Sequence, residues 1–303
     1  MKTKKRFPAY DIKSPKYPSL PSLYDNLAFQ DASFQGNQII LEFFDDHITD
    51  NKINGKELIR ELSSKYKISA GTEDLSRIKE MMAESYIVQT YNIAELFFKE
   101  FNKTYKQIHN ISTWKTTIKI GKSDKKLDPL NQLLNNLTAD KKKNLKRLPE
   151  FLLADYYRLL RNGYVHREIK KNVSLKKPKE YFEKHINSTI YHFQKYYKSI
   201  PKTGNLAPNL PEKLNHRDFV LYSRILRNLA NYLNELCPLS VEQAFELSEK
   251  DSKFFNTPKK INYHEFPNAK PKLDTYLKNY YKSNFGNDMI QIERFIEIFY
   301  SKY

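Results

Sequence analysis

Cysteine and glycine are both scarce in this chain of 303 residues, and long apolar runs are absent. The single cysteine, Cys237, excludes an internal disulfide and a zinc site built on cysteines. No run of about 18 or more apolar residues occurs, so the sequence predicts no transmembrane helix and no membrane partner. The basic start is not followed by an apolar stretch, so we expect no secretory signal. These absences predict a cytoplasmic protein.

Helical periodicity dominates what is present. With only seven glycines and almost no period-two alternation, the sequence predicts an all-α protein, a helical bundle with an amino-terminal arm and additional carboxy-terminal helices. The clearest pattern covers 74–109, where apolar residues recur at three- and four-residue steps, and another covers 178–199. The expected organisation is an extended proline-rich arm at 1–35, a helix–loop–helix at 36–70, a helical bundle at 72–200, a linker at 201–214 and a helical region at 215–303.

The charge of the chain points to a polyanionic partner. The formal net charge is +17, and 141–180 contain 13 Lys or Arg against 4 Asp or Glu, a local net charge of +9. A bias toward lysine, as an AT-rich genome produces, explains part of this excess but not its concentration in one segment. Nucleic acid is therefore the first expected partner, and an anionic membrane surface the second.

Two short motifs resemble a metal site and a nucleotide site. Residues 46–57 resemble part of a calcium-binding loop, but Ile48 offers no oxygen at its third position, so a helix–loop–helix without metal is favoured. The segment Gly121–Ser123 lacks the earlier glycine of a phosphate-binding loop, because Thr116 stands there. The seven histidines form no zinc pattern. We therefore expect no metal and no cofactor.

The stretch "YYRLLRNGYVHREIKK", 156–171, carries the most specific pattern. Its Asn-Gly pair is either a helix stop or part of a site formed by Arg161, Asn162 and His166. Asn162 and His166 share a helix face, whereas Arg161 and His166 are about 140° apart around a straight helix. One helix therefore does not focus both groups on a single phosphate. A break at Gly163, or a facing helix from a second copy, resolves this.

The pattern Arg161-Asn162 followed by His166 resembles the signature of HEPN-domain ribonucleases, the helical family of toxins, abortive-infection proteins and CRISPR effector nucleases. The resemblance covers roughly 72–200. It implies metal-independent RNA cleavage by attack of the ribose 2′-OH, which leaves a 2′,3′-cyclic phosphate and a 5′-OH. It also implies that the arginine stabilises phosphoryl charge, that the histidine transfers a proton and that the asparagine orients the histidine or the phosphate. A homodimer with a composite site, and an antitoxin or regulatory partner, belong to the same expectation.

Basic residues beside the motif are expected to bind the RNA backbone. They are Arg158, Arg167, Lys170 and Lys171. The pattern does not distinguish tRNA, mRNA and rRNA as targets. Two alternatives remain: a non-catalytic RNA-binding or regulatory helical protein, and an assembly protein that uses its aromatic helices for contacts. The heptapeptide at 156–162 recurs in degenerate form at 222–228, either as a duplication or, as we favour, through common helix residues.

Overall fold

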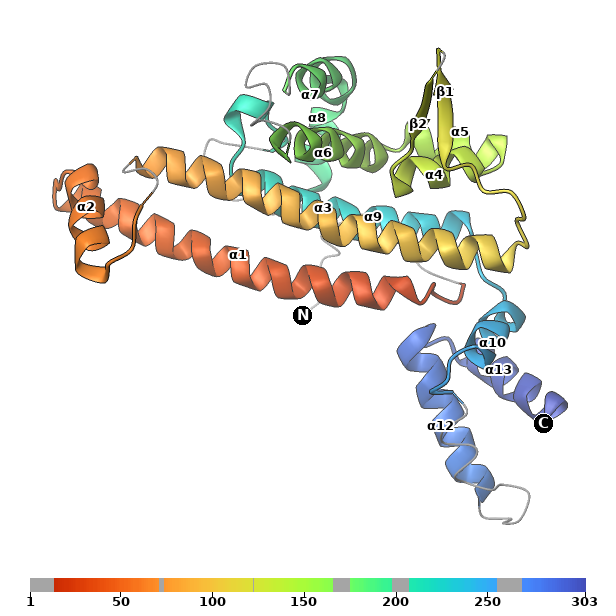
Figure 1. The fold of residues 1–303 in the computed structure, drawn as a ribbon. Coiled ribbons are helices and arrows are strands. Elements are labelled where there is room, and N and C mark those ends of the chain that lie inside the picture. The colour runs from red at the N-terminus through yellow and green to blue at the C-terminus, as the bar shows by residue number, and fades with distance from the viewer. Residues whose placement is uncertain (1–13, 71–73, 122, 166–174, 198–206, 255–268) are drawn as a thin grey trace. The chain divides into compact units, whose positions relative to one another are not determined.

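The structure, a computed structural model, describes residues 14–70, 74–121, 123–165, 175–197, 207–254 and 269–303. It confirms the predicted all-α class, because the described residues contain one two-stranded hairpin and are otherwise mostly helical (Figure 1). The longer helices are α1 (Ser19–Asp50), α2 (Gly55–Tyr66), α3 (Leu75–Ile108), α6 (Pro149–Val165), α9 (His216–Leu236), α12 (Ala269–Asn284) and α13 (Met289–Lys302). The shorter elements are β1 (Thr117–Ile120), β2 (Ser123–Lys126), α4 (Pro129–Asn136), α5 (Ala139–Arg147), α7 (Lys176–Tyr181), α8 (Ile190–Tyr196) and α10 (Val241–Glu249). None of the described helices is long and apolar enough to cross a membrane.

The chain divides into two compact units that differ from the predicted domains. The first unit contains Tyr24–Glu95 and Lys142–Asn228, and the second contains Leu96–Lys141 and Leu229–Tyr303. The expected boundary at 201–214 is therefore wrong for its described part. Residues 207–214 pack within the first unit, where Asn209 is hydrogen-bonded to the first turn of α9.

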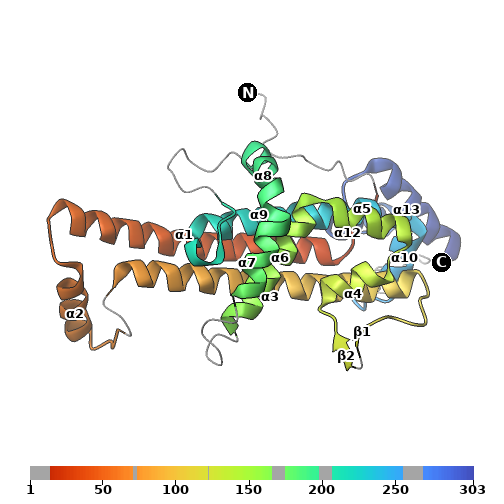
Figure 2. The same cartoon turned by 90° about the horizontal axis from the view of Figure 1, so that it is seen from above.

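Aromatic side chains form the core of the first unit. Phe34 of α1 stacks on Tyr86 of α3, with ring centroids 3.9 Å apart, and Phe219 of α9 lies 5.0 Å from Phe34. Further along α1, Asp45 binds Lys79 of α3 at 2.7 Å. Because a later residue of α1 meets an earlier residue of α3, the two helices run antiparallel here (Figures 1 and 2). Tyr157 of α6 lies 4.5 Å from a ring of α9. The core therefore joins α1, α3, α6 and α9.

The second unit has an aromatic core of its own. Its carboxy-terminal part is built by α10, α12 and α13, which pack around Phe245, Phe254 and Phe295. The hairpin β1–β2 is fixed at its base to α4, because Trp114 donates a hydrogen bond to Gln132. Ser240 and Gln243 form a capping box that starts α10.

The predicted extended arm at 1–35 is wrong for 19–35, which form the first half of α1. Pro21 lies in the first turn of the helix, where its missing N–H leaves no hydrogen bond unmade. Leu23, Leu27 and Phe34 are buried, which stabilises the helix by packing. The rest of the arm, 1–13, lies outside the described residues.

The helix–loop–helix at 46–57 has no room for a calcium loop. α1 extends through Asp46 to Asp50, and α2 begins at Gly55. Asn54 caps α2 by accepting hydrogen bonds from two backbone N–H groups of its first turn. Two positions of the resembled calcium loop, Asp46 and Asp50, therefore lie on α1. The stretch connects two helices.

The helix expected over 178–199 is interrupted. α7 passes at Phe182 into a π-helical turn, which is followed by a 3-10 turn and α8. α7 lies against α6 (Figure 1), and Phe182 packs edge-on against Tyr156 at 5.2 Å. The backbone keeps right-handed helical angles from Phe182 to Ile190, so the interruption changes the hydrogen-bond pattern of a continuing helical stretch.

Candidate functional site

α6 carries the Arg-Asn pair and passes through the adjacent glycine without a break. The helix extends to Val165, so Asn162-Gly163 is not a helix stop. Its buried face includes Tyr156 and Leu160, and Gly163 is buried as well. Since the chain itself covers Gly163, this position does not present an open surface to a second copy.

Arg161 is held on the surface of α6 by an aromatic ring and an amide. Its guanidinium carbon lies 5.2 Å from the ring centroid of Tyr91 on α3, a cation–π distance. Its Nη1 donates a hydrogen bond of 3.2 Å to Oδ1 of Asn162. Its Nε is buried without a hydrogen-bond partner among the described residues. The guanidinium is therefore oriented, partly desolvated and incompletely paired.

Arg161 differs in this respect from the arginines near it. Arg158 of the same helix binds Asp155 at 2.7 Å, and both side chains are largely buried. Arg227 of α9 binds Asp31 of α1 at 2.8 Å. No described carboxylate forms an ion pair with Arg161. Because an ion-paired or solvated guanidinium is the usual arrangement, an anion is the natural missing partner of Arg161.

The remaining predicted site residues have different outcomes. Arg158 is neutralised by Asp155, so it is not a free cation for RNA. The general acid–base candidate His166, and the backbone-binding candidates Arg167, Lys170 and Lys171, lie outside the described residues. The structure thus brings Arg161 and Asn162 together and leaves the histidine undescribed.

The second heptapeptide, at 222–228, uses its polar residues for packing. Arg227 is paired with Asp31, and the amide of Asn228 donates a hydrogen bond of 2.8 Å to the hydroxyl of Tyr197. Tyr222 packs against Tyr157. Each polar side chain named here has a partner in the protein, so this copy does not repeat the chemistry at Arg161.

A buried carboxylate and a histidine form a second polar cluster, which no motif in the sequence indicates because the two residues are 42 positions apart. Nε2 of His192 lies 3.0 Å from Oε1 of Glu150, and the hydroxyl of Tyr197 donates to the same oxygen at 2.9 Å. Burial raises the pKa of Glu150, but hydrogen bonds from His192 and Tyr197 outweigh it, so the pKa lies below its ordinary 4.5. Glu150 is therefore a buried anion stabilised by its donors.

Replacing His192 by alanine is expected to destabilise the protein by about 1–3 kcal/mol at neutral pH, because Glu150 loses a donor. The lowered pKa of Glu150 means that its contribution is present above 4.5 and is lost as the pH falls through the folded-state value. Urea unfolding of wild type and variant should therefore show a gap between their free energies of unfolding at neutral pH, and this gap should narrow in acid. Lys195→Ala, an exposed neighbour on α8, is the control and should leave the unfolding free energy unchanged. A gap that widens in acid would contradict this account.

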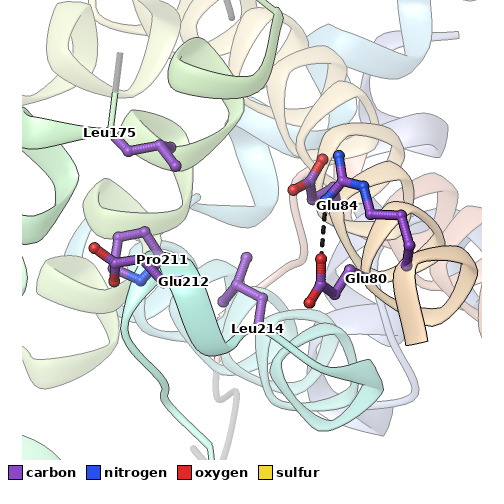
Figure 3. Close-up of a pocket in the computed structure, with 7 residues that line it drawn as sticks. Glu80, Glu84, Leu175, Pro211, Glu212 and Leu214 are labelled. Atoms are coloured by element: carbon purple, nitrogen blue, oxygen red, sulfur yellow. Dashed lines mark hydrogen bonds and ion pairs between the residues drawn. The ribbon is translucent and has the colours of Figure 1, made fainter. Parts of the chain in front are cut away.

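A small pocket in the first unit is acidic (Figure 3). Its polar lining consists of Glu80, Glu84 and Glu212 together with Arg77, whose Nη1 lies 2.9 Å from Glu80. Pro211, which also lines it, accepts a hydrogen bond from the hydroxyl of Tyr164 near the end of α6. Arg77, the one cation of its lining, is already paired with Glu80, and Glu212 is paired with Lys179 at 3.4 Å, so the pocket has no spare positive charge for a phosphate. The pocket is therefore not the binding site for an RNA backbone, and the described residues contain no metal-binding cluster.

Exposed lysines are concentrated on the β1–β2 hairpin in the second unit. Every described residue of this ribbon whose side chain is placed is exposed, including Lys119, Lys125 and Lys126. Gly121 has a φ of 62° at the end of β1, and Ser123 begins β2 opposite Ile120, so these two residues belong to a hairpin and not to a phosphate-binding loop. A two-stranded ribbon without a core of its own is marginal in water. Its lysines give it the charge to contact a polyanion.

The described chemistry thus consists of an incompletely paired arginine with its asparagine on α6, a buried Glu–His cluster on α6 and α8, and a basic hairpin. The arginine and the hairpin are suited to phosphate, and the buried cluster is explained by stability. Comparison of the chain with protein-family models, with curated proteins and with solved structures finds no significant match.

Proposed function

We propose that the chain is a metal-independent RNA endonuclease of the HEPN type, with Arg161, Asn162 and His166 as its catalytic residues. The observation that supports this most is the state of Arg161, which is partly buried on Tyr91 without a described carboxylate partner. A guanidinium fixed in this way can bind two oxygens of a phosphodiester and stabilise the charge that develops on them.

In the proposed reaction the ribose 2′-oxygen forms a bond to phosphorus while the bond from phosphorus to the 5′-oxygen breaks. A base removes the 2′-proton, and an acid supplies a proton to the leaving 5′-oxygen. The products are a 2′,3′-cyclic phosphate and a 5′-OH, with no net loss of water or protons. His166 performs one of these transfers, since an imidazole titrates near neutral pH.

Asn162 is assigned a positioning role in this proposal. Its Oδ1 accepts a hydrogen bond from Arg161, so the amide N–H groups are its remaining donors. They are suited to a phosphate oxygen or to the imidazole of His166. Asn162 thereby links the group that binds charge to the group that moves the proton.

The basic surface supplies affinity in the proposed enzyme. Lys119, Lys125 and Lys126 of the hairpin and the lysines of 141–180 attract the RNA backbone without reading its sequence. The proposal extends to a cytoplasmic toxin or abortive-infection effector with a regulatory partner such as an antitoxin, and with a composite dimeric site whose facing helix does not approach at the buried Gly163. The RNA class stays open between tRNA, mRNA and rRNA.

A second candidate function is non-catalytic RNA binding. The hairpin favours it, because its exposed lysines bind phosphate whether or not the RNA is cut. In that case His166→Ala leaves the function unchanged, whereas loss of the hairpin lysines removes it. The single substitution His166→Ala therefore distinguishes the two candidate functions.

The proposed function is tested by incubating wild type, His166→Ala and His192→Ala with total RNA and with tRNA in EDTA. Wild type and His192→Ala should cut RNA, and His166→Ala should not. His192 is the matched control because its partner Glu150 already explains it structurally. Equal cleavage by the His166→Ala protein, or cleavage abolished by EDTA, contradicts the proposed mechanism.

A further inference from the structure

α1 has apolar side chains on two opposite faces. One face packs inside the first unit, where Leu27 and Phe34 are buried. The opposite face presents a row, exposed except at the half-buried Gly36, that we call the outer stripe. The outer stripe consists of Phe29, Ala32, Gly36, Ile39, Ile40 and Phe43. At about 100° per residue, these six positions fall within roughly 120° of the helix circumference.

The outer stripe is unusually exposed for its size. Phe29 is 81% exposed, Phe43 72%, Ile39 70% and Ile40 67%. Taking about 150–250 Å² for a whole aromatic side chain, the two phenylalanines alone expose roughly 230–380 Å². With the isoleucines, the stripe reaches on the order of 500 Å², near the upper end of the largest apolar patches on monomers. A helix that is apolar on both faces is usually buried on both.

We infer that the outer stripe of α1 is covered by the outer stripe of a second copy, antiparallel and related by a two-fold axis at Gly36. In this arrangement Phe29 lies opposite Phe43, and Ile40 lies opposite Ala32. Large side chains therefore meet small or aromatic ones, and the two glycines face each other at the crossing. An interface of this kind is isologous, since one surface binds its own copy.

The charges of α1 agree with the antiparallel arrangement. The helix contains six Asp or Glu residues and no Lys or Arg. A parallel, in-register pair would place each acid beside its own copy. Antiparallel pairing about Gly36 instead places Asp25 opposite His47, Glu42 opposite Gln30 and Asp31 opposite Leu41. No acid then faces an acid, which removes the main repulsion.

The area also fits a stable interface. A standard interface buries about 800 Å² on each partner, of which a little over half is apolar. The outer stripe supplies about that apolar share by itself. The flanking polar residues of α1 provide the remainder as a rim.

Gly36 has a role in this dimer that it lacks in the protomer. A Cβ built at Gly36 meets no atom within 4 Å beyond its own stretch of helix backbone, so none of the described residues requires a glycine there. Glycine also weakens a helix interior. At a two-fold crossing, however, its missing side chain lets two helices approach closely. The inferred dimer does not depend on the proposed nuclease activity.

Sedimentation equilibrium of the full chain tests this inference. Wild type should be a dimer at micromolar concentrations. Phe43→Glu should raise the dimer dissociation constant by at least about a hundredfold, because two charges enter an apolar interface. Gly36→Leu should raise it at least about tenfold and yet raise the melting temperature of the protomer, because leucine favours the helix. If Gly36 served only the fold of the protomer, its replacement by leucine would not weaken the dimer while raising the melting temperature.

Cross-linking locates the two-fold axis. Gly36→Cys should form an intermolecular disulfide under mild oxidation, since Cys237 is buried and does not compete. Asp50→Cys, which lies 14 residues or about 21 Å along the helix from the axis, should not. Wild type that stays monomeric at micromolar concentrations, or a dimer unaffected by both stripe variants, overturns the inference.

Discussion

Arg161→Ala is expected to lower the rate of RNA cleavage by about a hundred- to a thousandfold, or roughly 2.7–4 kcal/mol of transition-state stabilisation. The side chain is already oriented by Tyr91 and Asn162, so little reorganisation precedes its contact with the phosphate. Arg161→Lys should recover only part of the rate, because an ammonium cannot form the paired hydrogen bonds of a guanidinium. Single-turnover cleavage of a labelled RNA at saturating protein measures both effects.

Arg227→Ala is the matched control for this experiment. Arg227 occupies the equivalent position of the related heptapeptide, but Asp31 already neutralises it. Its loss should lower stability and leave the cleavage rate of the folded protein unchanged. Equal losses of rate in both variants, or a fully active Arg161→Ala protein, contradict the assignment of Arg161.

Asp218→Ala is expected to have the largest effect on stability, a loss of about 3–5 kcal/mol in the free energy of unfolding. Asp218 is fully buried in the first turn of α9. It accepts hydrogen bonds from the hydroxyl of Tyr157 at 3.1 Å and from the backbone N–H of Asn215 at 3.1 Å. It also accepts from the backbone and side-chain N–H groups of Asn209, at 2.9 and 2.8 Å. Alanine leaves these donors buried without an acceptor.

The pH dependence of stability shows whether the buried Asp218 carboxyl causes that loss. Burial raises the pKa of Asp218 above its ordinary 3.8, although hydrogen bonds from Asn209, Asn215 and Tyr157 oppose the shift. A carboxyl group whose pKa is raised by folding adds stability at pH values below its unfolded-state pKa. This stability is lost as the pH rises through the folded-state pKa. Asp218→Asn should remove this dependence, whereas the exposed control Asp140→Ala should stay within about 0.5 kcal/mol of wild type. Chemical denaturation across acidic and neutral pH is the measurement, and a change below about 1 kcal/mol for Asp218→Ala contradicts the account.

Local patterns in the sequence were sufficient for part of the fold. The three- and four-residue spacing of 74–109 predicted α3 almost to its ends, because a long helix repeats one signal many times. The prolines of 1–35 were misleading, since Pro21 lies at the one part of a helix that tolerates proline. The boundary at 201–214 failed because Asn209 is fixed by Asp218 through tertiary hydrogen bonds that composition does not reveal.

Only the part of the candidate site that is local in the sequence could be predicted from it. Arg161 and Asn162 are neighbours in sequence, but the motif did not predict that Arg161 donates a hydrogen bond to Asn162. Glu150 and His192 are 42 positions apart, and only the fold brings them together. That no described carboxylate pairs with Arg161 was likewise invisible in the sequence, because the pairing of a charge is defined by what surrounds it.

The central claim is that this chain cuts RNA by attack of the 2′-OH without a metal. The most direct measurement is the chemistry of the RNA ends that the wild-type protein produces in EDTA. The account predicts 2′,3′-cyclic phosphate and 5′-OH ends, and none from an RNA whose cleaved nucleotide carries a 2′-deoxy sugar. Ends with a 5′-phosphate and a free 3′-OH, or cleavage of the deoxy-substituted RNA, would contradict it.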